Sequence, residues 1–260
     1  NAFWDGQRLT FGDGDGASSN YLGVLDIAAH ELGHAVTEYE ADLIYSYESG
    51  ALNEGASDIF AAVVEAHVDG GVTADTWDLG EDCWLSAPAL RYMDAPSDDG
   101  SSRDHYSNRY TGSSDNGGVH INSGIANHWF YLLSQGGQHH DSAYRSGYAV
   151  TGIGITDAHA IWYSALTNYM TSSTDFSGAR TATESACTGL GYAAAVCDDV
   201  SVAWFEVGVG SDPGGGGGTG GTGGTDGGGT GTDGGGTGTD GGGTGGDSGG
   251  TTGGDPVSCP

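Results

Sequence analysis

The last fifty residues of the chain cannot take part in a packed core. Residues 211–260 hold 26 of the 52 glycines and only two apolar side chains, Val257 and Cys259. They contain three copies of the heptad Thr-Asp-Gly-Gly-Gly-Thr-Gly, which lacks the apolar position of a calcium-binding β-roll repeat. Residues 211–254 are therefore expected to form a flexible, disordered linker, and residues 255–260 to begin a further, truncated module.

Charge and composition narrow the function classes of the remaining 210 residues. The whole chain carries 6 arginines and lysines against 35 aspartates and glutamates, which gives a formal charge of −29. Such a chain cannot neutralise a run of phosphates, so no nucleic-acid partner is expected. No apolar run approaches the ~20 residues of a membrane span. An acidic surface suits a saline extracellular habitat, and a plain solubility surface with cation-binding carboxylates is the alternative.

Helical periodicity dominates residues 1–210. Apolar side chains recur at helical spacing in two stripes, which are Ala158, Ile161, Trp162, Ala165, Leu166 and Tyr169, and then Val196, Val200, Trp204 and Val207. Helices are also predicted over residues 25–39, 52–67 and 122–134, and extended strands over residues 3–11 and 43–47. The expected fold class is therefore α+β, mainly α, with a short extended entry and a helical domain that ends near Gly210.

The segment His30-Glu31-Leu-Gly-His34 has the H-E-x-x-H pattern inside a predicted helix. Positions i and i+4 share one face of a helix, so both imidazoles can bind one Zn²⁺ while Glu31 projects beside the metal. A match of five residues also arises by chance, and two histidines on a solvated helix face are the alternative. The opposite face of the helix is apolar, which favours a buried helix and hence the zinc site.

A second acidic motif, Asn53-Glu54-Gly-Ala-Ser-Asp58, begins nineteen positions after His34. Glu54 is the candidate third ligand, because a catalytic zinc takes three protein ligands and keeps one open position. Asp58 lies one helical turn later and can accept the second N–H of a ligating histidine. The alternative for Asp58 is a surface carboxylate.

Further motifs extend over nearly all of residues 1–210. They are Asn1-Ala-Phe-Trp-Asp-Gly, Tyr45-Ser-Tyr-Glu-Ser-Gly-Ala, Trp77-Asp-Leu-Gly-Glu-Asp, Ala89-Leu-Arg-Tyr-Met, Asp104-His-Tyr-Ser-Asn-Arg-Tyr-Thr-Gly and Asp115-Asn-Gly-Gly-Val-His120-Ile-Asn-Ser-Gly-Ile. Together with the two motifs above, they resemble the thermolysin family of secreted zinc metallopeptidases. The resemblance implies that residues 1–45 form the end of an N-terminal lobe with the central zinc helix, and that residues 46–210 form the helical C-terminal catalytic lobe.

The resemblance also implies a role for individual residues. His30, His34 and Glu54 would bind one catalytic zinc, and Glu31 would activate a metal-bound water and pass its proton to the leaving amine. Tyr45 and His120 would donate to the developing oxyanion, with Asp115 orienting His120. The implied substrate-binding residues are Asn1, Ala2 and Arg91 for the peptide backbone, and Ile27, Leu79, Cys83 and Leu90 around an apolar pocket. An ordinary strand residue is the alternative for Tyr45, and a surface charge the alternative for Arg91.

A structural calcium ion is the second metal that the resemblance implies. The matching carboxylates are Asp26, Glu65, Asp78 and Glu81, which are hard oxygen ligands. Thr76 stands where the best-known members carry an acidic residue shared between two ions. A single calcium is therefore expected.

The cysteines and the other histidines are expected to be structural. Cys187 and Cys197 close a short loop and suit one disulfide in an oxidising compartment, with Cys83 left as a thiol. His105 is expected to be a structural hydrogen-bonding residue. The remaining histidines lack metal spacing relative to the HELGH motif and are predicted to be surface or satisfied side chains; these are His67, His128, His139, His140 and His159.

The resulting hypothesis is a secreted, extracellular, monomeric zinc endopeptidase that cleaves proteins or peptides on the amino side of bulky apolar residues. An inactive zinc-binding fragment and a secreted adhesion module are the alternatives, and Glu31 speaks against both, because a binding module needs no general base. Family members begin with a large β-rich lobe, so the chain is expected to be a fragment that lacks most of it. The apolar side of the zinc helix, with Val24, Ile27, Ala28 and Ala35, would then be uncovered.

Overall fold

The computed structural model describes residues 1–214, and the predicted linker and terminal module lie outside the described residues apart from 211–214. The element order is β1 (Ala2–Trp4), β2 (Leu9–Phe11), α1 (Leu25–Tyr39), α2 (Tyr47–Val68), β3 (Asp78–Leu79), β4 (Arg91–Tyr92), α3 (Asp115–Gln135), α4 (Ile155–Asn168), α5 (Phe176–Gly189) and α6 (Ala194–Glu206), with three short 3₁₀ turns between α2 and α3. The described chain is mainly helical with two small antiparallel sheets, β1–β2 and β3–β4. The predicted fold class is confirmed.

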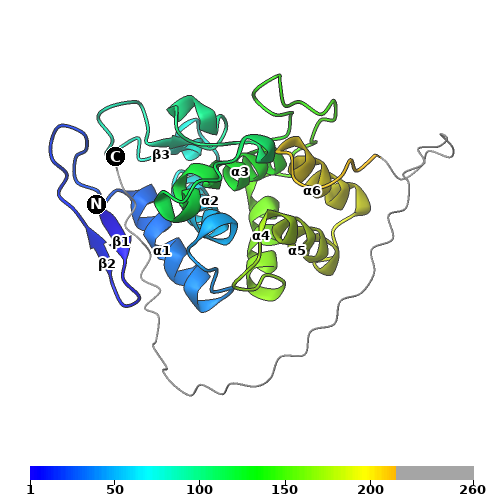
Figure 1. Cartoon of the computed structure of the whole chain (residues 1–260), viewed down its shortest axis with the longest axis horizontal. Helices are drawn as coiled ribbons and strands as arrows, with labels where there is room; N and C mark the ends of the chain where they lie inside the picture. The colour runs from blue at the N-terminus through cyan, green and yellow to red at the C-terminus, as the bar shows by residue number, and fades with distance from the viewer. Residues whose placement is uncertain (215–260) are drawn as a thin grey trace, which may run out of the picture.

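Helices α1, α2 and α3 form the centre of the molecule (Figure 1). Two glycines allow their close approach. A Cβ at Gly33 of α1 would lie 2.8 Å from Ser57 Cα of α2, and a Cβ at Gly55 of α2 would lie 2.7 Å from Ala126 Cβ of α3. Because real Cβ atoms essentially never come so close, only glycine lets these three backbones pack together here. The ligand-bearing faces of α1 and α2 are thereby held against each other.

Helices α4, α5 and α6 lie on the side of the molecule away from the β1–β2 hairpin (Figure 1). Fully buried tryptophans join α4 and α6 to α3: the Trp129 ring of α3 stacks on Trp204 of α6 at 4.6 Å and lies 5.5 Å from Trp162 of α4. The predicted disulfide between Cys187 and Cys197 is present and connects α5 to α6. Cys83 is a buried thiol that donates to the Gly80 carbonyl. Both expectations about the cysteines are confirmed.

Three predictions of secondary structure differ from the structure. Residues 3–11 do not form one extended strand, because β1 and β2 are two strands of an antiparallel hairpin. Residues 43–47 do not form a strand, because Tyr47 has a φ of +51° and α2 already starts at Tyr47, five residues before the predicted helix. Leu43 is buried in the preceding turn. The helix predicted from residue 122 starts at Asp115, but its first turn is interrupted by left-handed conformations at Asn116, Gly117 and Gly118. The alternating pattern at 43–47 reflects an ordered turn that packs one face on the core.

The exposed apolar surface of α1 also differs from the expectation. Ile27 and Ala35 are buried, and Ile27 packs with Ala2, Leu22 and Cys83 in a small cluster under the hairpin. Leu25, Leu32 and Tyr39 are the exposed large hydrophobic residues of this helix, with 41%, 53% and 75% of their surface accessible. Among the described residues, no helix is both long enough and apolar enough to cross a bilayer.

Candidate metal-dependent active site

Three side chains from α1 and α2 converge at one point. The Nε2 atoms of His30 and His34 lie 3.1 Å apart, and the two carboxylate oxygens of Glu54 lie 3.5 Å and 3.4 Å from them. Two ligands at ~2.0–2.1 Å from a tetrahedral zinc lie about 3.3 Å apart, so this spacing suits one zinc ion. Glu54 is fully buried, and its Oε2 has no hydrogen-bond partner among the described residues. The donor set and the orphaned oxygen both fit zinc.

The outer nitrogen of His30 is held by a buried carboxylate. Its Nδ1 lies 2.7 Å from Asp58 Oδ1, and Asp58 also accepts two N–H groups of Arg91 at 3.0 Å and 2.6 Å and one of Asn127 at 2.7 Å. Burial would raise the pKa of Asp58, but the guanidinium of Arg91 holds it well below its ordinary value. Asp58 is therefore ionised and accepts the Nδ1–H, which leaves the Nε2 lone pair of His30 for a metal. The surface alternative for Asp58 is wrong.

The outer nitrogen of His34 is held by an amide that sequence reasoning missed. Its Nδ1 lies 2.7 Å from Oδ1 of Asn53, whose own amide group donates to the Leu43 carbonyl at 3.0 Å. The second contact fixes the amide so that its oxygen faces the imidazole. Asn53 directly precedes Glu54 in the motif, and this adjacency to a predicted ligand was the available signal. The two histidines are thus oriented by different residues of α2.

Glu31 lies beside the three converging side chains and is only 1% exposed. Its Oε1 has no hydrogen-bond partner among the described residues. Burial raises the pKa of Glu31 to about 7, with a further rise from the charge of Glu54. A carboxyl group with this pKa can both accept and release a proton near neutral pH.

His120, Tyr45 and Asp115 form the opposite wall. Nε2 of His120 lies 3.2 Å from the Tyr45 hydroxyl, which also contacts Glu54, and Nδ1 of His120 lies 2.6 Å from Asp115 Oδ1. Burial would lower the pKa of His120, but the carboxylates of Glu54 and Asp115 outweigh it and raise the pKa. His120 is half-buried in the first regular turn of α3.

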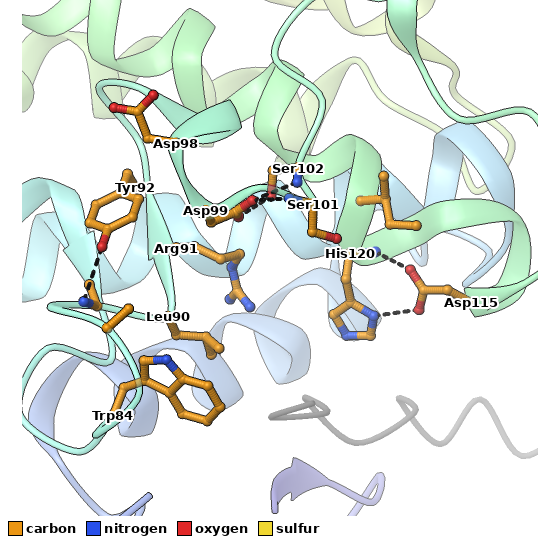
Figure 2. A pocket seen from close by; sticks show the side chains of 13 residues that line it. Trp84, Leu90, Arg91, Tyr92, Asp98, Asp99, Ser101, Ser102, Asp115 and His120 are labelled. Carbon is orange, nitrogen blue, oxygen red and sulfur yellow. Dashed lines mark hydrogen bonds and ion pairs between the residues drawn. The ribbon is translucent and has the colours of Figure 1, made fainter. Parts of the chain in front are cut away.

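A cleft of about 350 Å³ opens next to His120 and Asp115 (Figure 2). Trp84, Ala89 and Leu90 provide its apolar side, and Asp98, Asp99, Ser101 and Ser102 lie along its polar side. Arg91 lies between Leu90 and His120 in this view, so it lines the cleft while it binds Asp58 (Figure 2). The surface-charge alternative for Arg91 is wrong, since only 7% of the residue is exposed.

The other expected substrate-binding residues are distributed unevenly around this cleft. Leu90 lines it, whereas Ile27, Leu79 and Cys83 are each 1% exposed and are not among its lining residues. Asn1 is exposed, and Ala2 is buried on β1. The structure therefore places Leu90 at the cleft surface, and the other three expected pocket residues are buried and do not line the cleft.

Three of the four expected calcium ligands influence one another. Burial and the charges of Glu81 and Asp26 raise the pKa of Glu65 to about 8, and burial and Asp26 raise that of Glu81 to about 7. One carboxylate oxygen of each glutamate is buried with no partner among the described residues. The pKa of Asp78 is raised to about 6 by burial and by Asp94 and Asp75 instead. Asp26 accepts the Gly80 N–H at 2.5 Å.

The remaining histidines differ from one another. His105 bonds to Ser107, as expected of a structural side chain, and His67 is exposed. His159 is not satisfied, because its buried Nε2 has no partner among the described residues and its ring packs on Phe60 and Tyr163. His128 is buried and hydrogen-bonded. His139 and His140 are hydrogen-bonded as well, but they meet Asp104 in a second possible metal-binding group that sequence spacing did not indicate.

Comparison with known proteins gives consistent matches over the described chain. A family model described as thermolysin metallopeptidase, catalytic domain, matches residues 1–38, and one described as thermolysin metallopeptidase, alpha-helical domain, matches residues 41–209. Bacillolysin of Brevibacillus brevis is 48% identical over 214 residues, which cover 80% of this chain and 38% of the relative. Thermolysin of Alicyclobacillus acidocaldarius subsp. acidocaldarius is 45% identical over 214 residues, or 80% of this chain and 37% of that protein.

A solved structure agrees with the sequence matches. The precursor of protealysin, a metalloproteinase from Serratia proteamaculans, superposes with a TM-score of 0.69 at 33% sequence identity, over 81% of this chain and 65% of that chain. The chain spans less than two-fifths of the length of the curated relatives cited above.

Proposed function

The chain belongs to the thermolysin metallopeptidase family, and we propose that it carries the catalytic centre of a zinc-dependent endopeptidase. The proposal rests on the meeting of His30, His34 and Glu54 beside the buried Glu31, whose Oε1 has no hydrogen-bond partner among the described residues. These three residues would hold the zinc. When bound there, the metal would polarise the scissile carbonyl and acidify a water molecule.

Glu31 is the general base and acid of the proposed reaction. Its carboxylate takes a proton from the attacking water and delivers it to the leaving amine, for which a pKa of about 7 is suited. The protein walls exclude bulk water from this carboxylate, because only 1% of Glu31 is exposed. A module that only binds zinc would gain nothing from burying a base here, so the non-catalytic alternatives are not favoured.

His120 and Tyr45 stabilise the negative charge that develops on the carbonyl oxygen. Asp115 accepts the Nδ1–H of His120 and raises its pKa together with Glu54, so that Nε2–H is available as a donor. The Tyr45 hydroxyl lies 3.2 Å from that nitrogen, and the two donors therefore point at one region. Removing one such donor in an acyl-transfer site typically costs on the order of 10² to 10³ in turnover.

The substrate is proposed to be a protein or peptide that places a bulky apolar side chain in the cleft. Trp84, Ala89 and Leu90 supply the apolar contact, and Arg91 lies within reach of the peptide backbone. Ile27, Leu79 and Cys83 support the apolar side from behind, and Asn1 and Ala2 of the β1 edge are proposed to bind the extended substrate. Cleavage would occur on the amino side of the apolar residue.

The remaining proposals concern the setting of the enzyme. We propose a secreted, extracellular monomer, divided at residues 1–45 and 46–210 into a lobe end with the zinc helix and a helical catalytic lobe. One structural calcium is proposed at Asp26, Glu65, Asp78 and Glu81. The two unpartnered glutamate oxygens support a cation there.

Glu31→Gln tests the proposed function. The amide keeps the shape of the side chain but cannot accept a proton, so we expect turnover of a peptide substrate to fall on the order of 10² to 10⁴-fold while zinc stays bound. Glu40→Gln, at the exposed end of the same helix, is the matched control and should keep full activity. Wild-type turnover in the Glu31 variant would remove this residue from the mechanism, and loss of zinc would assign it a structural role.

A further inference from the structure

Asp104, His139 and His140 bring a second set of nitrogen and oxygen donors together, outside the active site. One ligand atom from each lies within 4.8 Å of the others. Asp104 belongs to the segment before the 3₁₀ turn Tyr106–Asn108, and the two histidines belong to the loop after α3. Segments 35 residues apart in sequence therefore meet at this point.

The Asp104 carboxylate is divided between the two histidines. Oδ2 lies 2.7 Å from His140 Nε2, while Oδ1 lies 3.8 Å from His139 Nε2 and has no hydrogen-bond partner among the described residues. Asp104 is 1% exposed and His139 is fully buried. A buried carboxylate oxygen with no partner costs free energy, which an inserted cation would recover.

We propose that Asp104, His139 and His140 form a second site for a divalent transition metal such as Zn²⁺. Two imidazole nitrogens and one carboxylate oxygen form a donor set that suits zinc better than calcium or magnesium. The side chain of His140 is 23% exposed, so it has room to move by the few tenths of an ångström that a metal between it and Asp104 requires. The same exposure leaves a fourth position that water can fill.

Metal binding requires one change in the hydrogen bonds of His139. Its Nδ1 accepts the N–H of Asp141 at 3.1 Å and its Nε2 contacts the Asp104 carbonyl at 3.2 Å, so in the metal-free chain the proton lies on Nε2. A metal at Nε2 moves this proton to Nδ1 and breaks the bond from Asp141. Asp141 is exposed, so its amide can turn to water instead.

The metal would stabilise the wall of the active-site cleft. Ser101 and Ser102 line that cleft, and the N–H of Arg103 donates to the Ile121 carbonyl at 2.7 Å, next to His120. Asp104 follows directly and is the ligand that the metal would tie to the loop after α3. The second ion is therefore structural, and it holds the segment 101–104 in place without contacting the reacting groups.

The experiment counts zinc in the whole chain. After equilibration with excess Zn²⁺ and removal of the unbound ion, elemental analysis and native mass spectrometry should find one zinc more in the wild type than in His140→Ala. The His140 variant should keep its catalytic zinc and its peptidase activity. The exposed His67→Ala is the matched control and should retain the wild-type count.

A second variant and a second metal test the same site independently. Asp104→Asn should also lose one zinc, and His140→Gln replaces His140→Ala if circular dichroism shows that the alanine variant is unfolded. Co²⁺ at the second site should give visible absorption bands that disappear in the His140 variant. Equal zinc counts in the wild type and the His140 variant, or unchanged cobalt bands, would overturn the proposal.

Discussion

The two groups of donors, His30–His34–Glu54 and Asp104–His139–His140, have the same ligand chemistry but different supports. In the first group every ligand comes from the long helices α1 and α2. In the second, every ligand comes from a segment between helices. Rigid helices fix side-chain directions more firmly than loops do, so the first group is already spaced for a metal and the second has to adjust.

The outer hydrogen bonds of the histidines show the same contrast. Asp58 and Asn53 accept the Nδ1–H groups of His30 and His34, which directs both Nε2 lone pairs at one point. In the second group the Nδ1 of His139 accepts a backbone N–H instead. The first arrangement favours metal binding in advance, and the second favours it only after a proton moves.

The surroundings decide what a metal could do at each place. The first group has Glu31 as the proposed base, His120 and Tyr45 as the proposed donors, and an adjacent cleft. In the second group, the rings of His105, His128 and Tyr144 surround His139. Equal ligand sets therefore allow metal binding at both places, whereas catalysis depends on the base and the donors around the metal.

Removal of one carboxylate from each group should give the largest difference between the two groups. Glu54→Gln should lose the catalytic zinc and reduce peptide hydrolysis to background, because two histidines alone hold zinc weakly. Asp104→Asn removes a carboxylate of similar burial and should leave hydrolysis within about twofold at 25 °C. Activity assays with parallel zinc analysis check both variants. Equal loss of activity in the two would mean that the second group also serves catalysis.

Loss of the hydrogen bond between His34 and Asn53 should have a smaller effect, on zinc affinity alone. Asn53→Ala removes the acceptor for His34 Nδ1–H, and loss of such a partner typically lowers metal affinity about 10- to 100-fold. Asn53→Asp restores an acceptor and should bind zinc more tightly than the alanine variant. Competition with a chromophoric chelator measures the affinities. If alanine binds zinc as tightly as the wild type, the orientation of His34 is set by its helix alone.

The first group, His30–His34–Glu54, was predictable from the sequence because helical spacing fixes it. His30 and His34 share a face of α1 by their four-residue separation, and Glu54 and Asp58 share a face of α2 in the same way. The cleft was less predictable: the sequence pointed to Ile27 and Leu79, which lie behind the surface, and missed Trp84. Distance along the chain does not tell which apolar side chains reach a cavity and which support it.

The second group could not be predicted, because its partners meet only through the tertiary packing of two loops. His139 and His140 are adjacent in the sequence, but no periodicity connects them to Asp104. Their spacing was compared only with the HELGH motif, which contributes no residue to this group. The strand predicted at 43–47 failed for a related reason, since alternation of apolar and polar residues also describes a turn that packs one side on the core. Local patterns specify helices better than they specify connections.

The smallest expected effect concerns the acidic group of Asp26, Glu65 and Glu81. Ordinary glutamates lose their proton near pH 4.5, but the folded pKa values of Glu65 and Glu81 are about 8 and about 7. Between these limits the folded chain binds more protons than the unfolded chain, so its stability falls as the pH rises from about 4.5 to about 8. With solvent screening taken into account, we expect a loss on the order of 1 to 2 kcal/mol between pH 5 and pH 6.5 without calcium.

Calcium and a glutamine variant isolate this contribution from the rest of the chain. In the Asp104–His140 pair, the lowered pKa of Asp104 contributes stability that is lost below about pH 4, and the raised pKa of His140 contributes stability that is lost above about pH 6.5. Neither change falls between pH 5 and pH 6.5. Urea unfolding of the protein with one zinc per chain across that interval should show the decline without calcium, a reversal with calcium, and a flatter profile in Glu65→Gln. A decline that calcium and the variant leave unchanged would show that these carboxylates do not bind the ion.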